Sequence, residues 1–171
     1  MAAAPPALFL TRGPADVAES SRLVERVFRE EFDLPLAELL ARYVETARRE
    51  FDESRDLLLT AEADGRKVGT LLVLHDAPPP APTVVFAWLA VEGSCRGQGI
   101  GRELLARAVE TCRQRRLVRL RARSFALAPA APHLYWMHGF RVVELSPVIV
   151  SGRPRETLLF EKLLGAPAAA G

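Results

Sequence analysis

A glycine-rich loop is the part of the chain whose residue types most clearly predict chemistry. It reads Arg96-Gly97-Gln98-Gly99-Ile100-Gly101 and joins an apolar run, 84–91, to an amphipathic segment. A helix that begins in such a loop leaves its first N–H groups without partners and adds the positive end of its dipole. Glycines let these donors approach an anion closely, so the pattern predicts a site for a pyrophosphate or a similar group.

Two other glycine-rich phosphate motifs do not match this loop. A P-loop needs Gly followed by Lys and Ser or Thr at the helix start, where this chain has Ile100-Gly101-Arg102-Glu103. A dinucleotide fingerprint needs G-x-G-x-x-G after an early strand, whereas the glycines at 97, 99 and 101 are spaced differently and lie past mid-chain. A glycine-rich turn without a ligand is the remaining alternative.

Length and composition predict one globular domain. The chain has 171 residues, of which 49% are hydrophobic and 26% are charged, and this length suits one core. We expect a single domain over 8–163. The ends, 1–7 and 165–171, consist mainly of Ala, Pro and Gly, which predicts flexible tails.

Several classes of protein are not favoured by the composition. No apolar run approaches the roughly 18 residues of a membrane span, and the start lacks a secretion signal, so we expect no membrane partner. The two cysteines, Cys95 and Cys112, form no disulfide framework, which indicates a reducing, cytoplasmic setting. A net charge of +2 is too small to predict a nucleic-acid partner. The histidines lack Cys, Asp or Glu partners at ligand spacing, so no metal is expected; they are His75, His133 and His138.

Hydrophobic periodicity and turn residues predict the elements that must position the loop. A strand at 8–10 precedes two helices, the first opened by a capping box at Asp16 and Glu19 and the second following Leu34-Pro35. A hairpin (57–63 and 67–75) around Asp64-Gly65 comes next. A proline-rich connection at 78–80 then leads to the strand 83–91, and the helix 101–115 follows the glycine loop. A strand (117–124), a short helix (129–138) and a strand pair (141–150 and 155–163) complete the order β-α-α-β-β-β-α-β-α-β-β.

Two motifs in this element order resemble a known family. The loop matches Arg-x-x-Gly-x-Gly, and the segment Leu134-Tyr135-Trp136-Met137-His138-Gly139-Phe140 matches Leu/Phe-Tyr-x-x-x-Gly-Phe. Both are similar to motifs of the GCN5-related N-acetyltransferase (GNAT) family, and the resemblance covers about 8–163. It implies an α/β (α+β) GNAT fold, with a mixed, largely antiparallel central sheet of about seven strands flanked by about four helices.

The resemblance also implies acetyl-CoA as cosubstrate. Backbone groups of Leu89, Ala90 and Val91 would pair with the pantetheine arm as if it were an extra strand, although an ordinary central strand is the alternative. Backbone amides of the loop would hold the pyrophosphate; these belong to Arg96, Gly97, Gln98, Gly99, Ile100, Gly101 and Arg102.

Acyl transfer to an amine needs a proton donor for the leaving thiolate and an acceptor for the amine proton. Tyr135 lies where the family has its general acid, and an aromatic core residue is the alternative. Glu92, just after the strand 83–91, is the nearest candidate for the base; its alternative is a solvated loop residue. His133 and His138 titrate in a useful range but are equally explained as surface residues.

The resemblance predicts an N-acetyltransferase that acts by direct attack in a ternary complex. Its acceptor would be a small-molecule or peptide amine, and a homodimer is possible. Ala128 stands where many members have asparagine, so a non-catalytic acyl-CoA sensor or scaffold is the second hypothesis. A third hypothesis, nucleic-acid contact, would use the arginines that follow the glycine loop, and it is disfavoured because no aromatic residue interleaves them; they are Arg113, Arg115, Arg116, Arg119, Arg121 and Arg123.

Overall fold

The fold is described here from a computed structural model, which covers residues 7–11, 14–75, 83–128 and 130–165. The chain divides into two compact units. The first unit is Met1–Leu74 with Ala87–Ala108, and the second is His75–Phe86 with Val109–Gly171. The strand β4 (Thr83–Val91) and the helix α3 (Ile100–Gln114) each contribute to both units.

The first unit holds the strands in the order β1-β2-β3-β4. Its elements are β1 (Ala7–Thr11), α1 (Pro14–Glu31), α2 (Leu34–Glu50), β2 (Leu57–Ala63), β3 (Arg66–His75), the end of β4, a short 3-10 helix η1 (Gly93–Cys95) and the start of α3. The pairs β1–β2 and β2–β3 are antiparallel. The predicted hairpin is confirmed, since Asp64 and Gly65 have φ of 51° and 72°, as a tight turn of this type requires.

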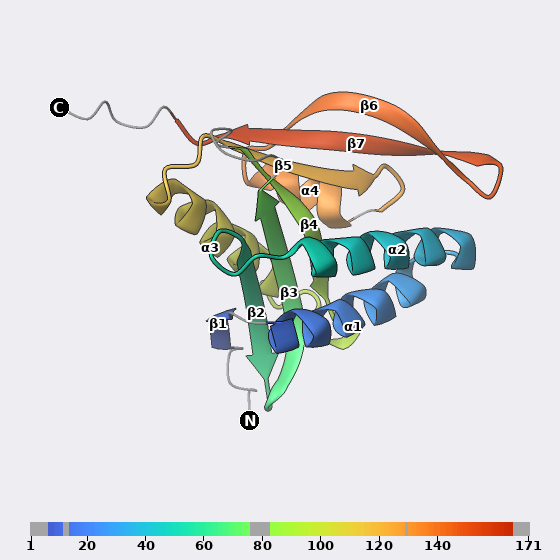
Figure 1. The fold of residues 1–171 in the computed structure, drawn as a ribbon. Helices are drawn as coiled ribbons and strands as arrows, with labels where there is room; N and C mark the ends of the chain where they lie inside the picture. The colour runs from blue at the N-terminus through green and yellow to red at the C-terminus, as the bar shows by residue number, and fades with distance from the viewer. Residues whose placement is uncertain (1–6, 12–13, 76–82, 129, 166–171) are drawn as a thin grey trace. The chain divides into compact units, whose positions relative to one another are not determined.

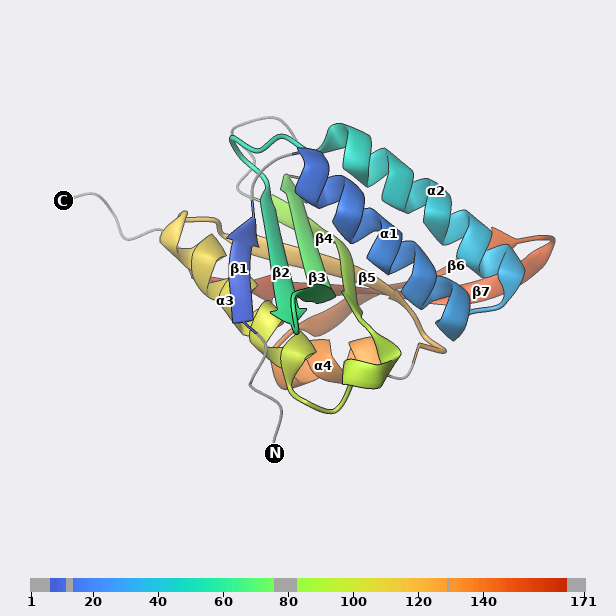
Figure 2. The same ribbon diagram turned by 90° about the horizontal axis from the view of Figure 1, so that it is seen from below.

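The helices α1 and α2 lie side by side and run in opposite directions (Figures 1 and 2). Asp33 begins α2 because its carboxylate accepts a hydrogen bond of 3.1 Å from the N–H of Leu36, which satisfies one of the free donors at a helix start. Both helices bury an apolar stripe, which includes Val17, Val24 and Val27 from α1 and Leu36, Ala37, Val44 and Ala47 from α2.

The predicted capping box at Asp16 and Glu19 is wrong. Helix α1 already includes Pro14, so Asp16 lies inside the first turn. Both carboxylates instead accept hydrogen bonds from the ammonium of Lys67 on β3, at 3.0 Å and 2.7 Å. A long-range ion pair therefore takes the place of the expected local contact.

The second unit holds the strands in the order β4-β5-β7-β6. After the end of α3 come β5 (Arg119–Phe125), α4 (Ala130–Met137), β6 (Arg141–Val150) and β7 (Arg153–Leu163). The β4–β5 pair is parallel, whereas β5–β7 and β6–β7 are antiparallel. Within the described residues the chain thus has seven strands and four α-helices, and the predicted GNAT fold with a mixed, largely antiparallel sheet is confirmed.

The three arginines of β5, of which Arg119 and Arg121 are half-buried and Arg123 is exposed, belong to an ion-pair network on one sheet face. Arg119 and Arg121 both contact the carboxylate of Glu161, at 3.6 Å and 3.1 Å, and Arg123 contacts Glu144 at 3.5 Å. Their positive charge is therefore partly balanced within the protein. The proline-rich connection predicted at 78–80 lies outside the described residues.

Candidate active site

The end of β4 is anchored to β3 inside the first unit. The buried Trp88 donates a hydrogen bond of 3.2 Å from its indole N–H to the hydroxyl of Thr70, and the backbone N–H of Glu92 donates to the carbonyl of Val68 at 2.8 Å. The paired segment of β4 and β5 comprises Thr83–Phe86 and Arg119–Ala122, so the predicted pantetheine strand, Leu89–Val91, comes after it in the chain. These two hydrogen bonds fix the end of β4, which precedes the glycine loop, to β3.

The glycine loop has the backbone conformation that its sequence predicts. Gly97 and Gly99 have φ of 75° and 81°, a region that residues with a Cβ rarely adopt. Within the described part of the chain, the N–H groups from Gly97 to Arg102 donate to no protein acceptor. Most of the loop is exposed, and a Cβ added at Gly97 or Gly99 would meet no atom within 4 Å. Free donors around open space suit an anionic group.

The side chain of Arg96, at the start of the glycine loop, contacts the end of β4 and the end of α1. Its guanidinium donates to the carbonyl of Val91 at 3.2 Å and lies 3.7 Å from the carboxylate of Glu31, at the end of α1. The predicted cofactor-binding residues from Leu89 to Arg102 all belong to the first unit, and among them Arg96 contacts the end of α1.

Glu92 is held by two arginines that local sequence patterns do not reveal. Its carboxylate contacts Arg26 of α1 at 3.1 Å and Arg66 of β3 at 3.2 Å, and its side chain is only 14% exposed. Oε1 accepts from both guanidinium groups, whereas Oε2 contacts Arg66 and accepts a hydrogen bond of 4.0 Å from the thiol of Cys95. Because Arg26 lies 66 residues from Glu92 in the chain, only the tertiary structure brings them together.

Gly69 on β3 lets the start of α3 pack closely on the sheet. A Cβ at this position would lie 2.9 Å from Cγ2 of Ile100 and 3.1 Å from Cδ1 of Leu104. Both of these side chains are buried, and Ile100 begins the helix that follows the glycine loop. Gly69 therefore helps to place the N–H groups of the loop, a role that the sequence analysis did not identify.

Replacing Gly69 with alanine is expected to overpack this contact, with a loss of about 1–3 kcal/mol in the free energy of unfolding. The displaced helix start should also weaken the binding of CoA, the cofactor that the family resemblance implies for this loop. Urea unfolding and calorimetric titration with CoA measure the two effects. Gly93→Ala is the control for stability, because its new Cβ would meet only a carboxylate oxygen at 3.8 Å. Unchanged CoA affinity in Gly69→Ala would contradict the positioning role.

Tyr135 lies in the second unit, within an aromatic cluster. Its ring centroid is 6.2 Å from that of Phe86, 5.5 Å from that of Phe140 and 5.3 Å from that of Phe160. The side chain is buried, and burial raises the pKa of its hydroxyl well above the ordinary value near 10. The group therefore stays protonated at neutral pH and can serve only as a proton donor there.

The described residues include no cluster of three or more His, Cys, Asp or Glu side chains that could hold a metal ion. Among the same residues, no helix is long and apolar enough to cross a membrane.

Comparisons with known proteins identify the family. The model of the acetyltransferase (GNAT) family matches residues 22–140. No sequence among curated proteins matches the chain.

Solved structures share the fold at low sequence identity. The ribosomal-protein-S18-alanine N-acetyltransferase of Escherichia coli is 14% identical, with a TM-score of 0.72 over 96% of this chain and 97% of the other. The ribosomal-protein-alanine N-acetyltransferase of Brucella melitensis is 23% identical, with a TM-score of 0.69 over 92% and 99%. The protein YncA of Salmonella typhimurium, solved with its cofactor acetyl-CoA, is 18% identical, with a TM-score of 0.72 over 98% and 99%.

Proposed function

Since the chain belongs to the acetyltransferase (GNAT) family, we propose that it transfers the acetyl group of acetyl-CoA to a primary amine. The observation that carries the proposal is the glycine loop, where two glycines with positive φ precede α3 and the N–H groups of the described loop lack protein acceptors. Such a cradle suits the pyrophosphate of CoA. Leu89, Ala90 and Val91 would offer backbone groups to the pantetheine arm.

The reaction we propose is a direct attack in a ternary complex. The neutral amine nitrogen forms a bond to the acetyl carbon, and the thioester C–S bond breaks. One proton passes from the amine to a base, and the leaving thiolate takes a proton from a general acid. Tyr135 is the proposed acid because burial keeps its hydroxyl protonated.

Glu92 is the proposed base. It lies one residue past β4, and Arg26, Arg66 and the thiol of Cys95 fix the carboxylate. The proposal adds a water as a further hydrogen-bond donor to Oε2, since a carboxylate oxygen can accept more than one hydrogen bond. Proton removal through such a water would leave the carboxylate in place during the reaction.

Glu92→Gln tests this role against a purely structural one. As a base, Glu92 should contribute about 10²- to 10⁴-fold to kcat, and the variant should lose that factor while it still binds CoA. If Glu92 only stabilises the fold through its ion pairs, the same substitution should lower the free energy of unfolding and leave kcat of the folded protein unchanged. Arg66→Gln is the matched control, since it removes one of the ion pairs but keeps the carboxylate.

The proposed activity itself is tested by incubating the purified protein with acetyl-CoA and a panel of primary amines. Release of CoA thiol together with an acetylated amine, seen by mass spectrometry, is the expected result. If calorimetry of the folded protein showed no CoA binding, the proposal would be wrong. CoA binding without turnover of any amine would instead favour an acyl-CoA sensor.

We further propose a cytoplasmic protein with one catalytic domain over 8–163, without a nucleic-acid partner. The pairing of the β5 arginines with carboxylates supports the last point.

A further inference from the structure

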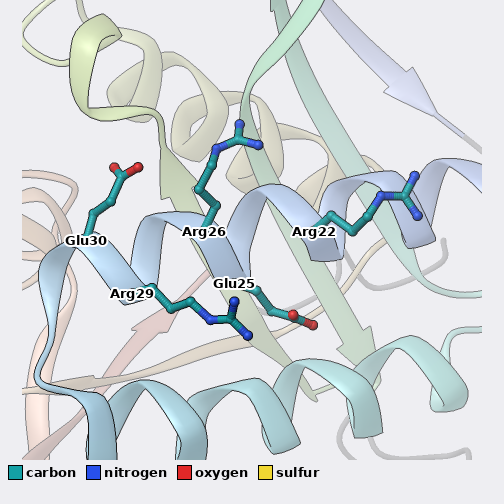
Figure 3. A pocket seen from close by; sticks show the side chains of 5 residues that line it. All are labelled: Arg22, Glu25, Arg26, Arg29 and Glu30. Atoms are coloured by element: carbon teal, nitrogen blue, oxygen red, sulfur yellow. The ribbon is translucent and has the colours of Figure 1, made fainter.

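The ammonium group of Lys162, on β7, is held against the turn that follows α4. It donates a hydrogen bond of 2.7 Å to the carbonyl of His138 and lies 5.9 Å from the ring centroid of Phe140. By contrast, Arg22 and Arg29, which line a pocket on α1, are exposed and extend from their helix (Figure 3). Lys162 is half-buried, and its cation serves contacts within the second unit.

Helix α4 ends in a Schellman motif that includes Tyr135. Gly139 has a φ of 76°, as the motif requires of the residue just past the helix end. The N–H of Phe140 donates to the carbonyl of Tyr135 at 3.0 Å, and the N–H of Gly139 donates to the carbonyl of Trp136 at 3.0 Å. These bonds satisfy two of the carbonyl groups that a helix end leaves free.

Lys162 completes the end of this helix. The carbonyl of His138 takes part in neither bond of the motif, and the ammonium group of Lys162 is its donor. A cation at this position also interacts favourably with the helix dipole. A Cβ at Gly139 would lie only 3.0 Å from the ammonium nitrogen, so the turn and the lysine fit closely. A compact ammonium group suits such a space better than a planar guanidinium group.

These contacts reach Tyr135 through Phe140. The two residues share a backbone hydrogen bond, and their ring centroids are 5.5 Å apart. Helix α4 has only eight residues, a length at which an isolated helix is unstable in water, so its geometry depends on tertiary contacts. Loss of the contact at its end should therefore displace the side chain of Tyr135.

We propose that Lys162 is a positioning residue for Tyr135. Its ammonium group, bound to the carbonyl of His138 and placed over the ring of Phe140, fixes the end of α4 and with it the direction of the Tyr135 hydroxyl. In this role Lys162 needs no contact with CoA or with the amine. The inference rests on the proposed acetyl transfer, and it adds a residue that lies outside both sequence motifs.

The test uses the two lysines of the chain. Lys162→Met removes the ammonium group and keeps an unbranched side chain of similar length. Lys67→Met is the matched control, because Lys67 is the other lysine and its ammonium group binds Asp16 and Glu19 in the first unit. Each variant loses charged contacts, so urea unfolding should show a lower free energy of unfolding for both. Only Lys162→Met should alter the surroundings of Tyr135.

We expect Lys162→Met to lower kcat by about ten- to a hundredfold, since a displacement of about 1 Å at a reacting group costs this much, while KM for acetyl-CoA stays the same. Lys67→Met should keep the wild-type kcat. In a Tyr135→Phe background, Lys162→Met should lower kcat no further, because the hydroxyl that it positions is absent. A wild-type kcat in Lys162→Met, or an equal loss of kcat in both backgrounds, would overturn the proposal.

Nuclear magnetic resonance separates this proposal from the proposed function. In Tyr43→Phe, Tyr135 is the one tyrosine left, so a ¹³C label on the tyrosine ring reports on it alone. Its resonance depends on the neighbouring aromatic rings, and it should shift in Lys162→Met but not in Lys67→Met. Such a shift without turnover of any amine supports the positioning role and assigns the failure to the proposed catalysis. An unshifted resonance together with turnover overturns the role of Lys162 and leaves the acetyltransferase proposal standing.

Discussion

Replacing Tyr135 with phenylalanine is expected to lower kcat by about 10²- to 10⁴-fold, the usual contribution of a general acid, with little change in CoA affinity. The substitution removes one hydroxyl and leaves the ring in its cluster with Phe86, Phe140 and Phe160. The fold should therefore be retained. Steady-state kinetics and calorimetric titration with CoA measure the two quantities.

The chain offers a matched control for this experiment. Its other tyrosine, Tyr43, lies on α2 and is 60% exposed. Tyr43→Phe removes the same hydroxyl from a solvated position, so we expect kcat to remain within about twofold of the wild-type value. If Tyr135→Phe also kept its kcat, the general acid would have to be another group, and Tyr135 would be a core residue only.

The raised pKa of Tyr135 should also change how the free energy of unfolding depends on pH above pH 10. In the unfolded chain the hydroxyl ionises near pH 10, whereas burial keeps it protonated in the folded protein to a higher pH. Above pH 10 unfolding therefore releases a proton, and the free energy of unfolding falls as the pH rises. Tyr135→Phe lacks this contribution, so its stability should fall less steeply above pH 10 in urea unfolding experiments.

Replacing Gly99 with alanine is expected to raise the Kd for CoA between about tenfold and a hundredfold. Its φ of 81° costs a residue with a Cβ roughly 1–2 kcal/mol, so the loop should relax toward another conformation. The new methyl group would also point into the open space around the free N–H groups. Both effects weaken the cradle that we assign to the pyrophosphate.

Gly65→Ala is the control for backbone strain. Gly65 has φ of 72°, and a Cβ there would also meet no atom within 4 Å. It lies in the β2–β3 hairpin turn, away from the loop in the chain, so it should lose stability without losing CoA affinity. Equal CoA affinity in both variants and the wild-type protein would contradict the assignment of the glycine loop as the pyrophosphate site.

Local patterns in the sequence sufficed for most elements of the fold. The alternation of Leu120 and Ala122 with arginines predicts the half-buried strand β5, and both apolar residues are buried. The turn at Asp64-Gly65 and the loop glycines were predictable because positive φ is a property of single residues. The 3-10 helix η1 was not predicted, since a single short turn leaves no periodic signal.

Local sequence patterns could not predict contacts between segments that lie far apart in the chain. Asp16 and Glu19 have the spacing of a capping box, yet they pair with Lys67, which lies 51 and 48 residues away. The spacing is compatible with either contact, and only the packing of α1 against β3 decides between them.

By itself, the sequence determined the order of the elements, the family and the conformation of the glycine loop, because these depend on hydrophobic periodicity and on backbone preferences within a few residues. The tertiary structure alone decided the surroundings of the candidate groups. It placed Arg26 and Arg66 on Glu92, packed Ile100 against Gly69 and buried Tyr135 among aromatic rings. Charge pairing and burial depend on which residues meet in space, and no local pattern contains that information.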